Sequence, residues 1–459
     1  MSVLLLVPGL ISLFLVLRGR IETAFLSVYL PCLLLLPEEY ALRIPHLPYF
    51  STAEFALIPL GFVGLSRFIR RNRSFALMDI LVVLYAASVG LSEILHAHVL
   101  NDGILAAINA FVSMVLAYMV GRQLIEPDLR FATVRRFVIL VLLNGIPGLY
   151  ELRMGDSLYG VFGEKFLGIP ILMQYRNGHA RIGRVFGGGE LAGIAFAMTF
   201  CLNAWLVYLR RVKAPVDLGK KLTKLERYHV PGLLLFLYEW LTQSRGPLIA
   251  LAAGYLIIHI PRISRFKNIK MMVFVIAVLL VGGYWAASAY ISSYTNVSGG
   301  SRISEQQQSA VYRREMNQVY APIAEAGGWT GWGVMGFPYI QGKKSIDNQY
   351  LLVHLAWGRL GYFLFLLITW ENIRVLIVRS WQFKALQDRA FVFSMLAAMA
   401  VLWITLLTVF LGEQLPQISF LLLGWIQSMV PGKIARSSSA QIAENRNMKL
   451  RNSSLESQR

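Results

Sequence analysis

Long apolar runs recur along the whole chain, and they constrain its fold more than any other feature. Most have about the length that an α-helix needs to cross a bilayer, roughly 20 residues. Within lipid, every backbone polar group must be hydrogen-bonded inside the protein, so repeated runs of this kind favour a helical bundle. We therefore predict an all-α, polytopic integral membrane protein. The mean hydropathy of +0.55 agrees with this class.

We predict about thirteen transmembrane helices (roughly 11–14), allowing for trimming and tilt. The predicted spans are 2–17, 21–37, 51–66, 76–95, 104–121, 137–150, 189–208, 229–243, 246–260, 271–290, 350–370, 390–411 and 415–431. They belong to a single transmembrane domain, residues 1–436. Two connections are long, 151–188 and 291–349, and the polar tail 437–459 is expected to be a disordered cytoplasmic end.

The positive charge follows the predicted topology. The 44 Lys and Arg residues against 25 Asp and Glu give a net charge of +19. Most of them occupy short segments between alternate apolar runs, which the positive-inside rule places in the cytoplasm. The two long connections then lie outside. Because topology accounts for the basic segments, no nucleic-acid partner is expected.

The polar interruption from Ser301 to Tyr350 carries the best candidates for function. Ser304-Glu-Gln-Gln307 has the form of a capping box and predicts a short helix over 305–320. Pro322 and the glycines that follow it predict a compact, turn-rich segment. Asp347-Asn348 falls where the chain re-enters the membrane and the next helix begins.

Several arginines are predicted to lie outside, against the orientation signal. They are Arg176, Arg181 and Arg184; Arg245; and Arg302, Arg313 and Arg314, with Arg359 deeper in a span. The planar fork of arginine donors suits the paired oxygens of phosphate or pyrophosphate. The alternative is that each arginine binds a lipid headgroup or pairs with a nearby glutamate. The clustering favours a ligand.

Arg245 follows an abrupt polar corner, Thr242-Gln-Ser244, between two apolar runs. Glu239 lies within the preceding span, where an ionisable residue is a functional candidate by default. We take Glu239 as a candidate catalytic residue and Arg245 as a candidate ligand-binding residue. The structural alternative is a Glu239–Arg245 ion pair that fixes the corner.

Asp347 and His354 would share one face of a helix, about 10 Å apart along its axis. Asp347 is nearer the outer surface, where a carboxylate could accept a proton from an incoming hydroxyl while arginines stabilise a departing pyrophosphate. This division of labour needs no metal ion or cofactor. The alternatives are that Asp347 caps the helix and that His354 is a packing residue.

Several known signatures are missing. The sequence has no phosphate-binding Gly-x-x-x-x-Gly-Lys-Ser/Thr loop, no His-Glu-x-x-His and no Gly-x-Ser-x-Gly. This argues against a nucleotide-driven pump, a zinc protease and a serine hydrolase. Cys32 and Cys201 both lie in apolar spans, so neither a disulfide nor a metal site is expected from them.

At these residues the chain resembles the superfamily of O-antigen ligases and Wzy-type polysaccharide polymerases of bacterial inner membranes. The matching pieces lie between about 180 and 370. They are Arg181-Ile-Gly-Arg184 leading through Gly187-Gly-Gly-Glu190 into a span; Ser244-Arg245-Gly; Arg313 or Arg314 ahead of Gly331-Trp-Gly333; and Asp347-Asn-Gln-Tyr-Leu351 followed by Gly358-Arg-Leu-Gly361. Each motif is short, so their order and topological placement carry most of the specificity.

The resemblance implies a glycosyltransferase of GT-C-like type at the periplasmic face of the inner membrane. It implies transfer of a glycan from undecaprenyl pyrophosphate to an acceptor hydroxyl, with inversion and without a metal. Arg245 with Arg313 or Arg314 would hold the pyrophosphate, and Arg181, Arg184 and His354 would contribute to binding. Partners would be the lipid-linked donor, a glycan or lipid-linked acceptor, membrane lipid and proteins of chain-length control or export.

In the ligases, the position of Asp347 is typically histidine, whereas many polymerase members have aspartate there. The aspartate therefore favours polymerisation of repeat units, as in O-antigen or exopolysaccharide synthesis, over ligation to lipid or protein. A transporter for the same lipid-linked glycan is the alternative from another class, and it predicts charged residues distributed through the spans. A scaffold of an export complex is a third interpretation.

Overall fold

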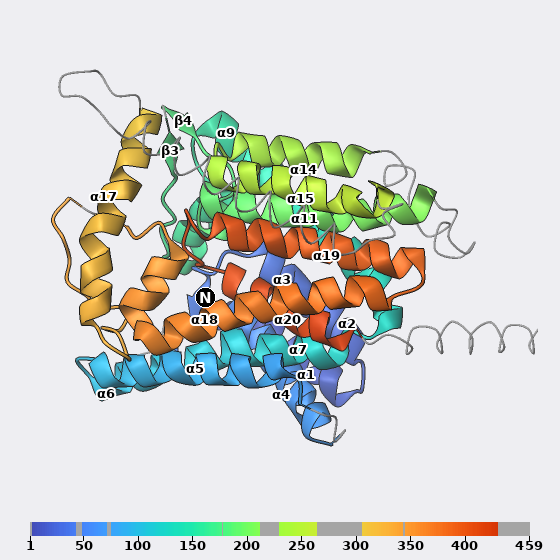
Figure 1. Cartoon of the computed structure of the whole chain (residues 1–459), viewed down its shortest axis with the longest axis horizontal. Coiled ribbons are helices and arrows are strands. Elements are labelled where there is room, and N and C mark those ends of the chain that lie inside the picture. Colours follow the sequence, from blue (N-terminus) through green and yellow to red (C-terminus); the bar gives the residue numbers. More distant parts are fainter. Residues whose placement is uncertain are drawn as a thin grey trace, which may run out of the picture.

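The structure, a computed structural model, describes residues 2–42, 48–70, 75–176, 178–211, 229–263, 305–342 and 345–429. These residues are mostly helical (Figure 1). The α-helices are α1 (Val7–Leu17), α2 (Ile21–Ala24), α3 (Leu30–Leu35), α4 (Thr52–Arg70), α5 (Leu77–His96), α6 (Leu100–Ala110), α7 (Ala117–Leu124), α8 (Arg130–Leu143), α9 (Gly145–Met154), α10 (Leu158–Phe162), α11 (Gly189–Arg211), α14 (Val230–Leu241), α15 (Arg245–Ile263), α17 (Glu305–Ala326), α18 (Gln349–Gln382), α19 (Leu386–Thr405) and α20 (Leu415–Ser428).

Short elements complete the described fold. The 3₁₀ turns are η1 (Ser2–Leu6), η4 (Pro127–Leu129) and η6 (Arg184–Phe186), and the π turns are η2 (Phe25–Tyr29), η3 (Phe111–Leu116) and η5 (Gly163–Leu167). Two antiparallel hairpins are present, one pairing β1 (Ala41–Leu42) with β2 (Phe50–Ser51) and one pairing β3 (Tyr175–Arg176) with β4 (His179–Ala180). The predicted all-α class is therefore confirmed in its main elements.

Six of the described helices are long and apolar enough to cross a membrane. They are Thr52–Arg70, Leu77–His96, Leu100–Leu124, Gly189–Arg210, Gln349–Gln382 and Leu386–Thr405, and shorter apolar helices cover Leu4–Leu17, Ile21–Leu35, Val230–Leu241 and Arg245–Ile260. The chain thus has the helices of a polytopic membrane protein. The predicted span 271–290 and the tail 437–459 lie outside the described residues, so the count of thirteen stays a prediction.

The predicted span 137–150 differs most from the structure. Two consecutive helices, α8 and α9, cover this region, and α8 begins at Arg130, well before the apolar run. Arg130 is buried because its Nη1 donates to Asp388 Oδ1 at 2.8 Å and its guanidinium lies over the Phe391 ring at 4.6 Å. Because Arg130 is paired in this way, it can be buried at the start of α8. Hydropathy alone places the start of this helix too late, at residue 137.

Close backbone contact holds the middle of the bundle together. At the crossing of α7 and α20, a Cβ atom added to Gly121 would lie 2.0 Å from the Leu421 carbonyl oxygen. Only a residue without a side chain fits, which is how helices in membranes approach closely. Cys32 and Cys201 are both buried and unpaired, as expected from their positions.

Helix α17 lies across one end of the helix stack, beside the β3–β4 hairpin (Figure 1). The predicted helix over 305–320 is confirmed, but it continues to Ala326. Pro322 therefore lies inside a helix, and the prediction that it opens the turn-rich segment was wrong. The extension is stabilised by tertiary packing, since Tyr320 and Ala324 are buried and the Trp332 indole donates to the Ile323 carbonyl at 2.9 Å.

The turn that follows α17 is bound to a break in α18, and we call this pairing the glycine lock. Gly358 has φ 65° and ψ −166°, which interrupts the helix. The turn forms four backbone hydrogen bonds with the broken ends of the helix: Trp332 N to Leu355 O (3.0 Å), Gly333 N to Ala356 O (2.8 Å), Arg359 N to Gly328 O (3.0 Å) and Leu360 N to Trp329 O (3.1 Å).

Only glycine fits at the centre of the lock. A Cβ atom on Gly358 would lie 2.3 Å from the Gly331 nitrogen, and one on Gly331 would lie 2.4 Å from the Ala356 oxygen. The Gly331-Trp-Gly333 and Gly358-Arg-Leu-Gly361 motifs therefore meet in space and have a structural role. The lock fixes the first turns of α18, which carry Asp347 at their start, against α17.

Candidate functional site: an arginine basin at one end of the bundle

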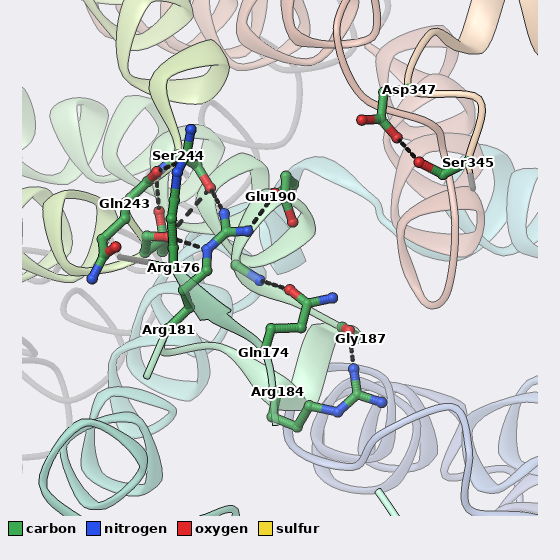
Figure 2. Close-up of polar contacts among 12 residues, drawn as sticks. Gln174, Arg176, Arg181, Arg184, Gly187, Glu190, Gln243, Ser244, Ser345 and Asp347 are labelled. Carbon is green, nitrogen blue, oxygen red and sulfur yellow. Dashed lines mark hydrogen bonds and ion pairs between the residues drawn. The ribbon is translucent and has the colours of Figure 1, made fainter. Parts of the chain in front are cut away.

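Arg181 holds the polar corner between α14 and α15. Its Nε donates to the Thr242 carbonyl at 2.9 Å, its Nη2 donates to Ser244 Oγ at 2.6 Å, and its Nη1 pairs with Glu190 (Figure 2). Gly189 makes room for it, because a Cβ atom there would lie 2.7 Å from Arg181 Nε. Arg181 is 7% exposed and its donors are engaged. Its evident role is to position the corner.

Arg176, on strand β3, also reaches the corner, where its Nη1 donates to the Gln243 carbonyl at 2.9 Å (Figure 2). Burial lowers the pKa of the Arg176 guanidinium, and the positive charges of Arg181, Arg245 and Arg313 lower that pKa further, whereas Glu190 raises it. Arg176 is thus affected by three other arginines, one beside its own hairpin and two from α15 and α17. We call Arg176, Arg181, Arg245 and Arg313 the arginine basin.

Arg245 is the first residue of α15, and its side chain is exposed. Within the described part of the chain it makes no hydrogen bond or ion pair. The Glu239–Arg245 ion pair considered from the sequence is therefore not formed. An unpaired guanidinium beside three others is unfavourable unless an anion joins them.

Glu239 is fully buried below the corner. Its Oε2 accepts from Thr242 Oγ1 at 3.3 Å and lies 2.8 Å from the position of a Cβ atom on Gly193, so the carboxyl packs against α11. Oε1 has no hydrogen-bond partner among the described residues. This placement supports a role in holding the corner, and the catalytic role of Glu239 stays a prediction from the sequence.

Asp347 joins the basin through Arg313. Arg313 lies on α17, and its Nε is 4.0 Å from Asp347 Oδ2 and has no hydrogen-bond partner in the described structure. Ser345 Oγ donates to Asp347 Oδ1 at 2.6 Å (Figure 2). Both ionic side chains are about a third exposed. An acid and a cation are therefore held side by side at the surface of the basin.

Asp347 is not the helix cap. The cap of α18 is Asn348, whose Oδ1 accepts from the backbone nitrogens of Tyr350 at 3.0 Å and Leu351 at 3.2 Å. The start of α18 is thus satisfied by a neutral side chain. The carboxylate of Asp347 remains available for another role.

Arg184 faces away from the basin, and Figure 2 shows its guanidinium directed toward Gly187 and away from Arg176. Its Nη2 pairs with Glu39 Oε1 at 2.5 Å, and Nη1 donates to the Gly187 carbonyl. The structure therefore separates Arg184 from Arg181, although only two residues lie between them. The left-handed glycines on either side of η6 reverse the chain at this point.

A group of four carboxyls surrounds Arg184, and we call it the carboxylate cluster: Glu38, Glu39, Glu54 and Glu413. Burial raises the pKa of Glu413 to about 7, with a further increase from Glu39 and a decrease from Arg184. Burial followed by the charges of Glu54, Glu413 and Glu39 raises the pKa of Glu38 well above its ordinary value. We did not expect this cluster, although each member stands at an end of an apolar run.

Arg314 and His354 belong to other surroundings. Arg314 is exposed on α17 next to Arg313. His354 stacks on Tyr362 with ring centroids 5.1 Å apart, and its Nε2 lies 4.0 Å from Glu325 Oε1 at the far end of α17. Among the described residues, the contacts of His354 are with Tyr362 and Glu325 rather than with Asp347, which favours the packing alternative for His354 over substrate binding.

The basin combines one exposed arginine without a partner in the described structure, Arg245, with the surface pair of Arg313 and Asp347. Such an arrangement can bind a polyanion and accept a proton from a group placed beside it. Among the described residues, no group of three or more His, Cys, Asp or Glu side chains is arranged to hold a metal ion. A search of known protein families and of curated proteins found no match to this chain.

Proposed function

We propose that the chain is a polysaccharide polymerase of the bacterial inner membrane. It transfers glycan repeat units from undecaprenyl pyrophosphate to the hydroxyl of an acceptor glycan at the periplasmic face. The observation that carries the proposal is the pairing of Arg313 Nε with Asp347 Oδ2 at 4.0 Å, since this carboxylate is not used to cap α18. The pair lies in a basin whose exposed Arg245 has no partner in the described structure.

In the proposed glycosyl transfer, the carboxylate and the arginines of the basin have different roles. The acceptor hydroxyl attacks the anomeric carbon, and its proton passes to the carboxylate of Asp347. The bond from the anomeric carbon to the pyrophosphate oxygen breaks, and the electron pair leaves with the pyrophosphate. Arg245 and Arg313 stabilise the charge that develops on this leaving group, with Arg176 adding to the positive field. Attack from the opposite side of the sugar gives inversion.

Arg181 is a positioning residue in this scheme. It fixes the Thr242–Ser244 corner from which α15 and Arg245 start. Arg314, Arg184 and His354 lie outside the basin, and the scheme gives them no direct step. The crowding of cations at one end of the bundle supports surface chemistry over transport through the spans.

The test uses cells that lack the chromosomal copy and carry variants at matched expression. Arg245→Ala and Asp347→Asn are expected to shorten the polymer chain-length distribution to single repeat units. Arg359→Gln is the matched control, because this exposed arginine lies at the same end and pairs with Glu325 at 2.8 Å outside the basin. Unchanged polymer length in both basin variants would overturn the proposal.

A purified reaction separates the alternatives. With the lipid-linked donor in nanodiscs, a polymerase forms a product in which the acceptor is another lipid-linked glycan. A ligase product carries a different lipid or a protein as acceptor. Movement of the donor across the membrane with no new glycosidic bond would instead identify a transporter.

A further inference from the structure

A polar pocket opens at the turn between α1 and α2, and we call it the turn pocket. It has a volume of about 340 Å³, within the range of small-ligand sites. Charged groups of both signs line it, namely Arg20, Arg67, Glu22 and Glu126. The pocket lies where α4 and α7 end, and the positive-inside rule assigns this end to the cytoplasm.

An apolar groove of about 630 Å³ runs between α1 and α4 toward the same place. Leu13 and Val16 form one wall, and Ile58, Phe62 and Val63 form the other. Leu13 is 43% and Phe62 is 55% exposed, so the groove faces outward from the bundle. We call it the α1–α4 groove, and Figure 1 shows its two helices side by side.

Arg67 lines both the turn pocket and the groove. The groove thus ends at a cation, and Arg70 stands at the same end. Within the described structure, the side chains of Arg20 and Arg67 make no hydrogen bond or ion pair. The orientation signal explains why arginines occur at this end of the helices, but it explains neither a cavity between them nor Glu22 in its wall.

We propose that the turn pocket and the α1–α4 groove together bind one phospholipid with a zwitterionic, ethanolamine-type headgroup. The phosphate lies between Arg20 and Arg67, where two guanidiniums supply its donors. The ammonium group lies toward the carboxylate of Glu22. One acyl chain follows the groove along Leu13, Val16 and Phe62. Charge of both signs in one pocket fits this headgroup better than a purely anionic one.

The experiment is native mass spectrometry of the full chain, delipidated and then mixed with phosphatidylethanolamine or phosphatidylglycerol of identical acyl chains. We expect one phosphatidylethanolamine to be retained at about tenfold lower lipid concentration than phosphatidylglycerol. Arg67→Gln should abolish this retention, and Val63→Trp should do the same by filling the groove. Glu22→Gln should retain lipid but lose the preference between headgroups.

Arg18→Gln is the matched control. Arg18 belongs to the same turn but lines neither cavity, and its guanidinium lies over the Phe14 ring at 4.2 Å. It should bind lipid as the unchanged chain does. Equal retention by Arg67→Gln and Arg18→Gln, or a preference of the unchanged chain for phosphatidylglycerol, would overturn the proposal.

Discussion

Buried or partly buried arginines occur at both ends of the helix stack, but their partners differ. At the end of α5 opposite the glycine lock, Arg122 donates from Nε to Asp79 Oδ1 at 3.1 Å, and Tyr118 donates to the same carboxylate. Arg122 Nη1 and Arg379 Nη2 both donate to the Gln427 carbonyl. In the arginine basin, by contrast, Arg245 has no partner in the described structure.

The difference separates structural arginines from ligand-binding ones. A buried cation with fixed carboxylate and carbonyl partners leaves few donors for a ligand, and removing either partner exposes an uncompensated charge. A cation without partners contributes little to the fold and is available to an incoming anion. Within the basin, Arg181 is of the structural kind, since Glu190, Thr242 and Ser244 occupy its donors, and Arg176 also donates to the Gln243 carbonyl.

The largest effect on stability is expected for Asp79→Ala. Both side chains of the Asp79–Arg122 pair are at most 7% exposed, so the substitution leaves Arg122 buried without its carboxylate. We expect a loss of about 3–5 kcal/mol in the free energy of unfolding. Unfolding in bicelles measures it. The exposed Asp128→Ala is the control, and an equal small change in both would contradict the comparison.

Comparing Arg181→Ala with Arg245→Ala should distinguish the structural arginine of the basin from the ligand-binding one. It leaves the Thr242 carbonyl and Ser244 without donors and Glu190 without its cation, and we expect a loss of about 2–4 kcal/mol in stability. Arg245→Ala should change stability by less than about 0.5 kcal/mol. Thermal unfolding of both variants in one detergent measures the difference. Equal destabilisation would show that Arg245 also has a structural role.

The carboxylate cluster makes stability depend on pH. The pKa of Glu413 is raised to about 7 in the folded protein, so the folded state holds this proton more tightly than the unfolded chain. Its contribution is fully present below the ordinary pKa of 4.5 and is lost as the pH rises through about 7.

We therefore expect Glu413→Gln to match the unchanged chain at pH 4 and to exceed its stability at pH 8 by about 3 kcal/mol. Melting curves across this pH range provide the measurement. Glu164→Gln, at an exposed position, should show no such trend. A constant difference at all pH values would rule out titration of Glu413 as the cause.

The smallest effect concerns the start of α18. Asn348→Ala removes the cap from Tyr350 and Leu351 and should cost about 1 kcal/mol, whereas Asn348→Asp should retain most of the stability. Asp347→Ala should cost less than Asn348→Ala, because Asp347 makes no capping bond. A larger loss for Asp347→Ala would mean that its carboxylate is structural.

The sequence was sufficient to predict the all-α class and several of the long apolar helices, although not the bounds of α8 and α9 or the position of Pro322. Apolar runs determine where helices form, and the arginines of the basin were noticed because the predicted topology places them against the charge rule. Asp347 was identifiable because it precedes a long apolar run. The helix over 305–320 followed from its capping residues.

The partners of these residues required the structure. Arg181 and Arg184 stand in one motif, yet the chain reversal at η6 gives them different neighbours. The carboxylate cluster joins segments centred on 38, 54 and 413, whose proximity no local pattern encodes. The same reason applies to Arg130, whose burial depends on Asp388 from a distant helix.

The glycine lock determines which residues of this region can be replaced during evolution. Its four hydrogen bonds use backbone atoms alone, and the close contacts at its centre require glycine at Gly331 and Gly358. The exposed side chains around it, such as Trp329 and Met335, can therefore be replaced without moving Asp347. The surface of this end of the molecule can therefore vary in sequence while the start of α18 keeps its position.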